Sequence, residues 1–384
     1  MSRKVLLIEP NYRNKYPPLS LMKLATYHRQ LGDDVTFFKG KNEDFAIRET
    51  MRLLLATLEH NDQSVCWRAH YEEIVTYLKK GQETSLIKLA ASSNSPLVKK
   101  NLQAYRQYYR RKDYLRNPQW DRVCITTLFT FYWKQTIEAI NFFKQFAKTP
   151  DQVFVGGIAA SVVPKEMEAE TGILPIVGLL NHGGELDAGN TTIIDNLPLD
   201  YSILEEIDYQ YPEHDGYYGY MTRGCVNHCA FCVVPTLEPQ YEEHLPILKR
   251  IEATRKQFGE KRNLLLLDNN VLASKKFDAI INEIKTAGFY RGATYVAPDL
   301  YEVALQNIQN GYNIPAYLKS LFHQYERLLQ KIKNEKEKQT VFRVLHEHAL
   351  DNLHTMEVKM YLPSMNFSVQ NLLSYIKISP KHVM

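Results

Sequence analysis

The chain has 384 residues, of which 45% are hydrophobic and 23% charged, and its formal net charge is only +4. This composition excludes a disordered chain and fits a soluble, globular protein long enough for two domains. Only four consecutive apolar residues, 5–8, stand near the start, too few for a signal peptide, and no run reaches membrane-spanning length. We therefore expect a cytoplasmic protein without a membrane partner.

The first part of the chain alternates short apolar runs with stretches of helical periodicity. The runs of four to eight apolar residues indicate buried strands, and apolar positions three and four apart indicate helices between them. The predicted elements, in order, are a strand at 5–8, a helix at 19–31, strands at 35–38 and 123–125, a helix at 137–146 and a strand at 153–155. This alternation predicts a doubly wound, Rossmann-like α/β sheet.

A long insertion, about residues 43–119, separates the second and third predicted strands. Residues 51–58 and 74–78 have helical spacing, and the polar run at 92–96 indicates a loop. The sequence therefore predicts that the insertion is helical.

The last helix of the insertion combines tyrosines with basic residues. Three tyrosines share one face and two arginines lie one turn apart on another: Tyr105, Tyr108, Tyr109, Arg106 and Arg110. Residues 99–122 carry eight basic against two acidic side chains, a local charge of +6. Such a surface is able to stack bases and hold phosphates, which predicts weak, salt-sensitive RNA binding. The alternative is a structural helix that buries its tyrosines against the α/β domain and leaves its arginines in solvent.

A connector rich in proline and tyrosine, residues 196–212, predicts a domain boundary near residue 195. We therefore expect one domain at 1–195, with the insertion, and a second at 196–384. The elements predicted in the second domain are strands at 217–221 and 264–267, helices at 245–258, 277–287 and 300–330, and late strands at 356–362 and 372–378.

Three of the five cysteines lie within eight residues at C-x3-C-x2-C spacing: Cys225, Cys229 and Cys232. Thiolates so close together favour a shared soft-metal centre over a disulfide framework. A structural zinc site needs a fourth ligand, and only His228 lies nearby, while a ferredoxin cubane takes four cysteines. Three thiolates on a four-iron cluster would leave one iron open for a substrate. The two distant cysteines, Cys66 and Cys124, are predicted to be core residues.

This cysteine motif, with Phe231 before its third cysteine, resembles the signature of the radical S-adenosylmethionine (SAM) superfamily. The flanking segments 222–225 and 232–235 resemble the cluster loops of tRNA methylthiotransferases and of cobalamin-associated radical enzymes. The resemblance implies a [4Fe-4S] cluster held by the three cysteines, SAM chelated by the open iron, and one-electron cleavage of SAM to a 5′-deoxyadenosyl radical. It also implies an electron donor such as flavodoxin or ferredoxin.

The resemblance also implies a partial β/α (TIM-like) barrel of six strand-helix units, with the cluster loop after its first strand. Only three or four of its strands are visible in the sequence, so we expect an incomplete barrel with extra helices. In the family, polar side chains after the next strand help to hold SAM, which makes Asp268, Asn269 and Asn270, with Phe231, the candidate cofactor-binding residues. The alternative for the three polar residues is a turn and helix cap.

The N-terminal domain resembles the cobalamin-binding domain of one radical SAM group, through residues 16–21 and 155–161. It lacks a D-x-H-x-x-G ligand motif, and Lys39 stands where an acid is usual. Because a doubly wound sheet does not itself imply a ligand, a cobalamin-binding and a ligand-free domain both stay open.

Two functions follow from these residues. The first is a radical SAM enzyme of methyl or methylthio transfer, with an unidentified substrate. The second is a non-catalytic iron-sulfur or zinc-binding interaction protein derived from the same fold.

Overall fold

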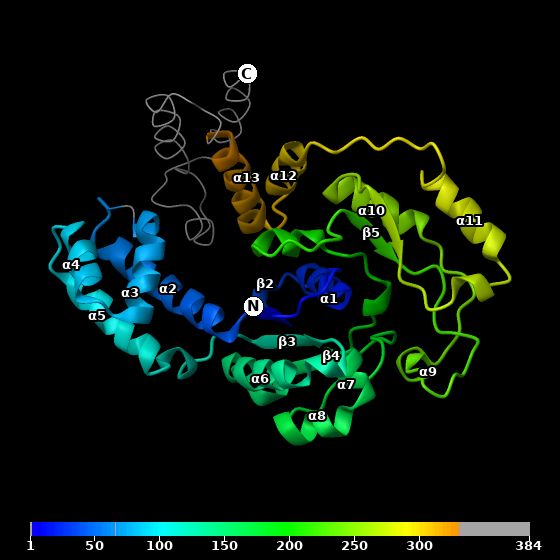
Figure 1. The fold of residues 1–384 in the computed structure, drawn as a ribbon, viewed down its shortest axis with the longest axis horizontal. Helices are drawn as coiled ribbons and strands as arrows, with labels where there is room; N and C mark the ends of the chain where they lie inside the picture. Colours follow the sequence, from blue (N-terminus) through cyan, green and yellow to red (C-terminus); the bar gives the residue numbers. More distant parts are fainter. Residues whose placement is uncertain (1, 66, 330–384) are drawn as a thin grey trace. The chain divides into compact units, whose positions relative to one another are not determined.

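The computed structural model describes residues 2–65 and 67–329, which divide between two compact units (Figure 1). The first unit comprises residues 2–42 and 118–303, and the described part of the second comprises 43–117 and 304–329. The boundary predicted near residue 195 falls inside the first unit, so the division at that point stays a prediction. The late strands predicted at 356–362 and 372–378 lie outside the described residues.

A four-stranded parallel sheet forms the centre of the first unit. Its strands are β1 (Lys4–Pro10), β2 (Asp34–Gly40), β3 (Arg122–Thr127) and β4 (Val153–Gly157), in the order β2-β1-β3-β4. Helices α1 (Leu19–Gln30) and α6 (Trp133–Phe143) lie on opposite faces of the sheet (Figure 1), and β4 is followed by α7 (Ile158–Val162) and α8 (Pro164–Thr171). The predicted parallel α/β sheet is confirmed.

The strands are apolar on both faces because helices cover both sides of the sheet. Residues 5–8 of β1 have no exposed surface, and Leu7 pairs with Phe37 of β2 and Cys124 of β3. Burial of Cys124 confirms the prediction that it is a core residue, and it raises the pKa of this thiol to about 12. Cys66 lies outside the described residues.

A buried ion pair lies at the carboxyl end of the sheet, where Glu9 of β1 pairs with Lys39 of β2. Lys39 Nζ is 3.2 Å from Glu9 Oε2, the Tyr211 hydroxyl donates a hydrogen bond to Glu9, and Lys39 Nζ lies 4.6 Å from the ring centre of Tyr209. Burial raises the pKa of Glu9 and lowers that of Lys39, and each charge opposes the effect on the other. Lys39 is therefore the internal counterion of Glu9.

His28, at the end of α1, is fully buried, and its Nδ1 lies 2.8 Å from Asp33 Oδ2. Burial lowers the pKa of His28 to about 4, although the Asp33 carboxylate acts in the opposite direction. The imidazole is therefore neutral in the folded protein at pH 7.

Acidification is expected to destabilise the protein through His28. Between pH 6.5 and 4 the histidine is protonated in the unfolded chain but not in the folded protein. The free energy of unfolding therefore falls by about 3 kcal/mol as the pH drops from 6.5 to 4. Above pH 6.5, His28 does not change the free energy of unfolding. Urea unfolding at several pH values, for wild type and His28→Asn, measures the difference. An identical pH dependence in the two proteins would contradict this role.

The insertion folds into four helices with a core of their own. They are α2 (Asn42–Asn61), α3 (Tyr71–Lys80), α4 (Glu83–Ala91) and α5 (Leu97–Arg110). The helices predicted at 51–58 and 74–78 lie within α2 and α3, the predicted loop at 92–96 joins α4 to α5, and α4 itself was not predicted. Trp67, Leu54 and Leu102 lie at the centre of this core without exposed surface.

The tyrosines of α5 pack inside the insertion. Tyr105 and Tyr109 lie against its core, and the Tyr105 hydroxyl is 2.9 Å from Thr57 Oγ1. The structural alternative was therefore right about packing and wrong about the partner, which is the insertion rather than the α/β sheet. It was also wrong about Arg106, whose guanidinium covers Gly81 so closely that a Cβ on this glycine would lie 2.0 Å away.

Two helices replace the single helix predicted at 300–330. They are α12 (Leu300–Gln309) and α13 (Ile314–Leu329). Gly311 and Asn313 between them have positive φ angles of 71° and 42°, which a continuous right-handed helix does not allow.

A second parallel sheet in the first unit carries the cysteines. It pairs β5 (Gly216–Gly219) with β6 (Asn263–Leu266), and the connection contains α9 (Val234–Leu237) and α10 (Leu248–Phe258), while α11 (Phe277–Thr286) follows β6. Tyr217, Ile251 and Ile280 join strand and helices in one small core. The strand-helix-strand pattern was predicted; the sheet has two strands within the described residues, so a larger barrel stays a proposal.

Candidate metal centre

The three clustered cysteines lie on an irregular loop between β5 and α9. Cys225 and Cys232 are half-buried, Cys229 is exposed, and none of the three is in a disulfide. The amide of Cys232 donates a hydrogen bond of 3.0 Å to the carbonyl of Cys229, which makes a tight turn between these two residues. Because the carboxyl ends of parallel strands meet at one edge, this loop lies beside the residues that follow β6.

Asp268, directly after β6, anchors the start of the cysteine loop. Its carboxylate accepts hydrogen bonds from the amides of Met221, at 3.0 Å, and Thr222, and from Thr222 Oγ1 at 2.6 Å. A carboxylate with three such donors holds the loop to the neighbouring strand more rigidly than a neutral side chain would. The contacts of Asp268 are thus with two backbone amides and one hydroxyl of the loop, and its predicted contact with SAM stays a prediction.

Asn270 and Asn269 also contact the cysteine loop. Asn270 Nδ2 lies 3.6 Å from Cys225 Sγ, and the amide of Asn227 lies 3.4 Å from the same sulfur. Asn269 Nδ2 donates to Glu238 Oε2 at 2.8 Å. The side chain of Asn270 makes no capping hydrogen bond to the short helix after it, so the capping alternative does not describe it. Two N–H donors therefore face Cys225 Sγ.

The buried side chain of Arg223 links the start of the cysteine loop to two carboxylates. Its Nη2 contacts both carboxylate oxygens of Asp195 at 2.8 Å, and its Nη1 lies 2.5 Å from Glu238 Oε1. The guanidinium also lies 3.7 Å from the ring centre of Tyr220. Its backbone exchanges two hydrogen bonds with Glu242, at 3.1 and 3.0 Å. Both the side chain and the backbone of Arg223 therefore fix the segment just before Cys225.

Asp195 joins the cysteine loop to helix α1 of the larger sheet. Lys23 Nζ lies 2.5 Å from Asp195 Oδ1 and donates to the Asp195 carbonyl at 2.6 Å. Burial would raise the pKa of Asp195, but the charges of Lys23 and Arg223 outweigh it and hold that pKa below its usual range. The sequence gives no signal for this network, because its members are far apart in the chain, with 172 positions separating Lys23 from Asp195.

Gly224 has a conformation and a position that require glycine. Its φ is +64°, and a Cβ would lie 2.5 Å from the carbonyl oxygen of Gln240 and 3.0 Å from that of Glu238. Its amide donates to Glu238 Oε2 at 2.8 Å. The backbone of Gly224 therefore packs directly against the segment that follows α9, with no room for a side chain.

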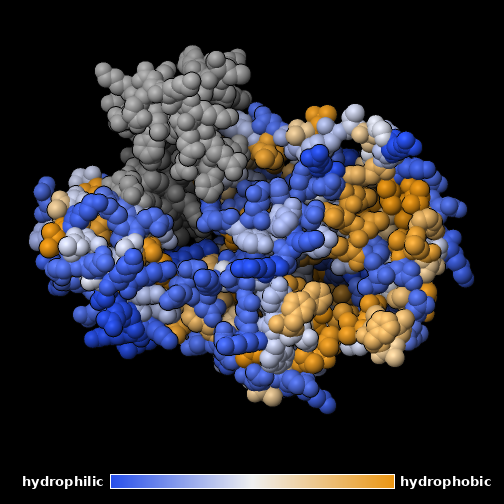
Figure 2. All heavy atoms as spheres, in the orientation of Figure 1, coloured by the Kyte–Doolittle hydropathy of each residue, from blue (hydrophilic) through white to orange (hydrophobic). Residues whose placement is uncertain are grey.

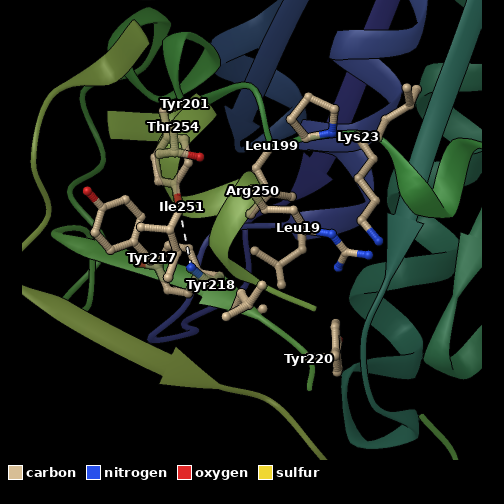
Figure 3. A pocket seen from close by; sticks show the side chains of 14 residues that line it. Leu19, Lys23, Leu199, Tyr201, Tyr217, Tyr218, Tyr220, Arg250, Ile251 and Thr254 are labelled. Atoms are coloured by element: carbon tan, nitrogen blue, oxygen red, sulfur yellow. Dashed lines mark hydrogen bonds between the residues drawn. The ribbon is translucent and has the colours of Figure 1, made fainter. Parts of the chain in front are cut away.

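A small cavity lies near this network (Figure 3). Its volume is about 30 Å³, enough for one or two water molecules and too small for a nucleoside. The side-chain ends of Lys23 and Arg250 point to the same side of it, opposite Tyr217 (Figure 3). The cavity belongs to the packing beneath the loop and is not a SAM site.

The chemistry of the donor set fits an iron-sulfur cluster. One loop supplies three thiols that are not in disulfides, and N–H groups face one of the sulfurs. In residues 2–65 and 67–329 no three His, Cys, Asp or Glu side chains are gathered into a metal-binding group. His228, the alternative zinc ligand, is exposed, and so is Phe231, at 91% of its surface. Cluster binding thus requires the exposed part of the loop to bring the cysteines together.

No helix in the described part of the chain is long and apolar enough to cross a membrane.

No protein-family model and no curated protein sequence matches the chain. Two solved structures to which it is similar are both of TsrM, a radical SAM methyltransferase from Kitasatospora setae. The one with tryptophan substrate and the SAM analogue aza-SAM bound is 15% identical, with a TM-score of 0.39 over 74% of this chain and 51% of that chain. The one with cobalamin and a [4Fe-4S] cluster bound is 15% identical, with a TM-score of 0.37 over 81% and 53%. The chain spans about half the length of these structures, and its own cysteine loop, rather than this likeness, carries the functional proposal.

Proposed function

We propose that the chain is a radical SAM enzyme whose three cysteines, Cys225, Cys229 and Cys232, hold a [4Fe-4S] cluster. The observation that carries the proposal is the cysteine loop itself, with three free thiols after the first strand of a parallel sheet. The loop is anchored at its base by Asp268 and Arg223 and left exposed at Cys229. A structural metal site is normally closed by four protein ligands, whereas this loop provides three cysteines and leaves one of them accessible.

When bound, the cluster and SAM would supply one-electron cleavage of the sulfonium, which starts radical chemistry on a substrate. The residues of the chain provide position. Asp268 and Arg223 hold the backbone before Cys225, and the N–H groups of Asn227 and Asn270 stabilise negative charge on its sulfur. An electron donor such as flavodoxin or ferredoxin would deliver the electron at the exposed side of the loop.

We propose cobalamin as a second cofactor and methyl transfer as the reaction, with the cobalamin at the carboxyl edge of the larger sheet. The strand order reverses between β1 and β3, and ligands of doubly wound sheets bind at such a point. The neighbouring edge between β1 and β2 is filled by Glu9, Lys39 and Tyr211. Retention of hydroxocobalamin through desalting, read from the visible spectrum, tests this part, and a spectrum without corrin bands would exclude it.

A non-catalytic iron-sulfur or zinc protein is the competing function, because the sheet that carries the cysteines has only two strands within the described residues. The two functions differ in one assay. Anaerobically reconstituted and reduced protein should cleave SAM to 5′-deoxyadenosine and methionine if it is an enzyme. A full cluster that neither binds nor cleaves SAM would favour the competing function.

Substitution of any one clustered cysteine by Ala is expected to remove most of the iron and the broad iron-sulfur absorbance. A cluster already one thiolate short of four cannot readily lose another. Wild type should carry about four irons per chain after anaerobic reconstitution. Iron and sulfide analysis with visible spectroscopy measures the loss in Cys225→Ala, Cys229→Ala and Cys232→Ala.

The matched control for this experiment is Cys124→Ala, because Cys124 is buried in β3, away from the cysteine loop. Its iron content should equal that of wild type. Tightly held zinc without iron or sulfide, weakened by His228→Ala as much as by a cysteine change, would contradict the cluster.

A further inference from the structure

One side of α5 carries basic side chains and no acidic ones. The exposed residues of α5 are Leu97, Lys99, Lys100, Gln103, Ala104, Gln107 and Arg110, and Arg111 at its C-terminal cap is exposed too. The opposite side packs into the core of the insertion through Val98, Leu102, Tyr105 and Tyr109. Lys112, directly after the helix, is exposed as well. Figure 2 shows deeply hydrophilic atoms at the lower left, where Figure 1 places this helix.

The cations of this side differ from four other cations of the insertion in having no acidic partner. Lys99, Lys100 and Arg110 to Lys112 make no ion pair within residues 2–65 and 67–329. Elsewhere in the insertion, ion pairs join Arg52 to Glu49, Lys79 to Asp44, Lys88 to Glu73 and Arg116 to Asp113. Five cations without an ion pair in the described part of the chain thus lie along one side of α5 and in the two residues that follow it.

Lys112 adds a second observation. It ends α5 in the left-handed conformation, with φ 57° and ψ 34°. Helices usually place glycine there, because any side chain strains this conformation. The chain therefore keeps a cation at a position where glycine would give a more stable fold, and this cation extends the basic side of the helix.

We propose that the basic face of α5, defined as Lys99, Lys100, Arg110, Arg111 and Lys112, binds the phosphate backbone of a folded nucleic acid. Cations spread over nearly four helical turns match a line of phosphates. Tyr105 and Tyr109 pack against the core, and the ring of Tyr108 contacts those of Tyr105 and Tyr114, so none of the three lies among these cations for base stacking. The face therefore recognises phosphate charge and not base sequence.

A lipid surface fits this face less well. Membrane-binding helices place apolar side chains beside their basic ones so that these insert below the headgroups. Between the cations of α5 stand Gln103, Ala104 and Gln107. The one large exposed apolar side chain of the helix is Leu97, at its start, which is too little to insert below the headgroups. RNA and DNA share the phosphate backbone, so the experiment has to separate these two sources.

The test compares wild type with the fourfold variant Lys99→Gln, Lys100→Gln, Arg110→Gln, Arg111→Gln. Fluorescence anisotropy with labelled tRNA and with a DNA duplex, at about 50 and 200 mM salt, gives the dissociation constants. We expect at least tenfold weaker binding at low salt and a salt slope reduced by roughly 0.9 for each phosphate that the variant no longer neutralises. The matched control neutralises four exposed lysines of the first unit, Lys249, Lys256, Lys275 and Lys276, and should bind as wild type does.

The variant Lys112→Gly distinguishes a loss of binding from a loss of folding. It should raise the melting temperature and at the same time weaken nucleic-acid binding, so the weaker binding would not be due to unfolding. Tighter binding to tRNA than to the duplex would assign RNA, and the reverse would assign DNA. Equal affinity of the fourfold variant and wild type, equal losses in the control variant, or binding of wild type to anionic vesicles without binding to either nucleic acid would overturn the proposal.

Discussion

Replacement of Lys39 by Met is expected to lower the free energy of unfolding by about 3–5 kcal/mol at pH 7. The substitution keeps the volume of the side chain and removes the positive charge 3.2 Å from Glu9. Glu9 has no exposed surface, so the variant leaves a buried carboxylate without its counterion. Urea unfolding measures the loss, and an unfolding free energy equal to that of wild type would contradict the ion pair.

The stability lost in Lys39→Met is expected to depend on pH. Without the ammonium group, burial raises the pKa of Glu9 further, and the folded variant binds a proton there. When the pKa of a carboxyl group is higher in the folded than in the unfolded protein, the full stability is present below the unfolded pKa, about 4.3. That stability is then lost as the pH rises from the unfolded toward the folded pKa. The deficit should therefore shrink in acid, and the added substitution Glu9→Gln should restore much of the stability at pH 7.

A surface ion pair supplies the matched control for Lys39→Met. Lys148 Nζ lies 2.6 Å from Asp121 Oδ1, but both side chains are substantially exposed. Lys148→Met should cost less than about 1 kcal/mol, because water solvates the remaining carboxylate. The charges are closer in the surface pair than in the buried pair, so a smaller loss at Lys148 reflects solvent exposure and not a longer distance.

Replacement of Gly224 by Ala is expected to abolish most cluster binding. The added Cβ would lie 2.5 Å from the Gln240 carbonyl oxygen, and φ at this residue is +64°. The backbone before Cys225 must then move, which breaks the hydrogen bond from the Gly224 amide to Glu238. The strain alone costs about 1–2 kcal/mol, and the displaced loop should bind several-fold less iron after anaerobic reconstitution.

Gly172 provides the control for this experiment. Its φ is +67°, nearly that of Gly224, but no other residue lies within 4 Å of an added Cβ. Gly172→Ala should therefore show the backbone strain without the collision, with a similar small loss of stability and the iron content of wild type. Equal iron content in the two variants would mean that the segment before Cys225 does not control cluster binding.

The sequence predicted the larger sheet well because its strands are short runs of apolar residues that helices bury on both sides. The same reasoning missed α4, because only two residues of this helix, Leu86 and Leu89, are buried. It also joined α12 and α13, because their apolar periodicity continues across Gly311. Periodicity locates buried faces, whereas the ends of helices depend on local backbone conformation.

The cysteine loop was predictable because its ligands are adjacent in sequence. Its anchors were not, because Asp195, Lys23 and Glu238 come from separate segments and resemble ordinary surface charges in the sequence. Asp268 was singled out from its place after β6, but its observed hydrogen bonds come from two backbone amides of the loop and from Thr222 Oγ1. Tertiary contacts between distant charged residues leave no local pattern from which they can be inferred.

The position of the insertion between β2 and β3 sets the order in which the sheet can assemble. Strand β1 pairs with β2 across one helix, but it pairs with β3 only after the whole insertion has been synthesised. A flexible segment of that length would make loop closure costly in entropy and slow. Since the insertion has its own apolar core, it can fold early and turn this loop into a rigid spacer, so the central β1–β3 pairing becomes the late step of folding.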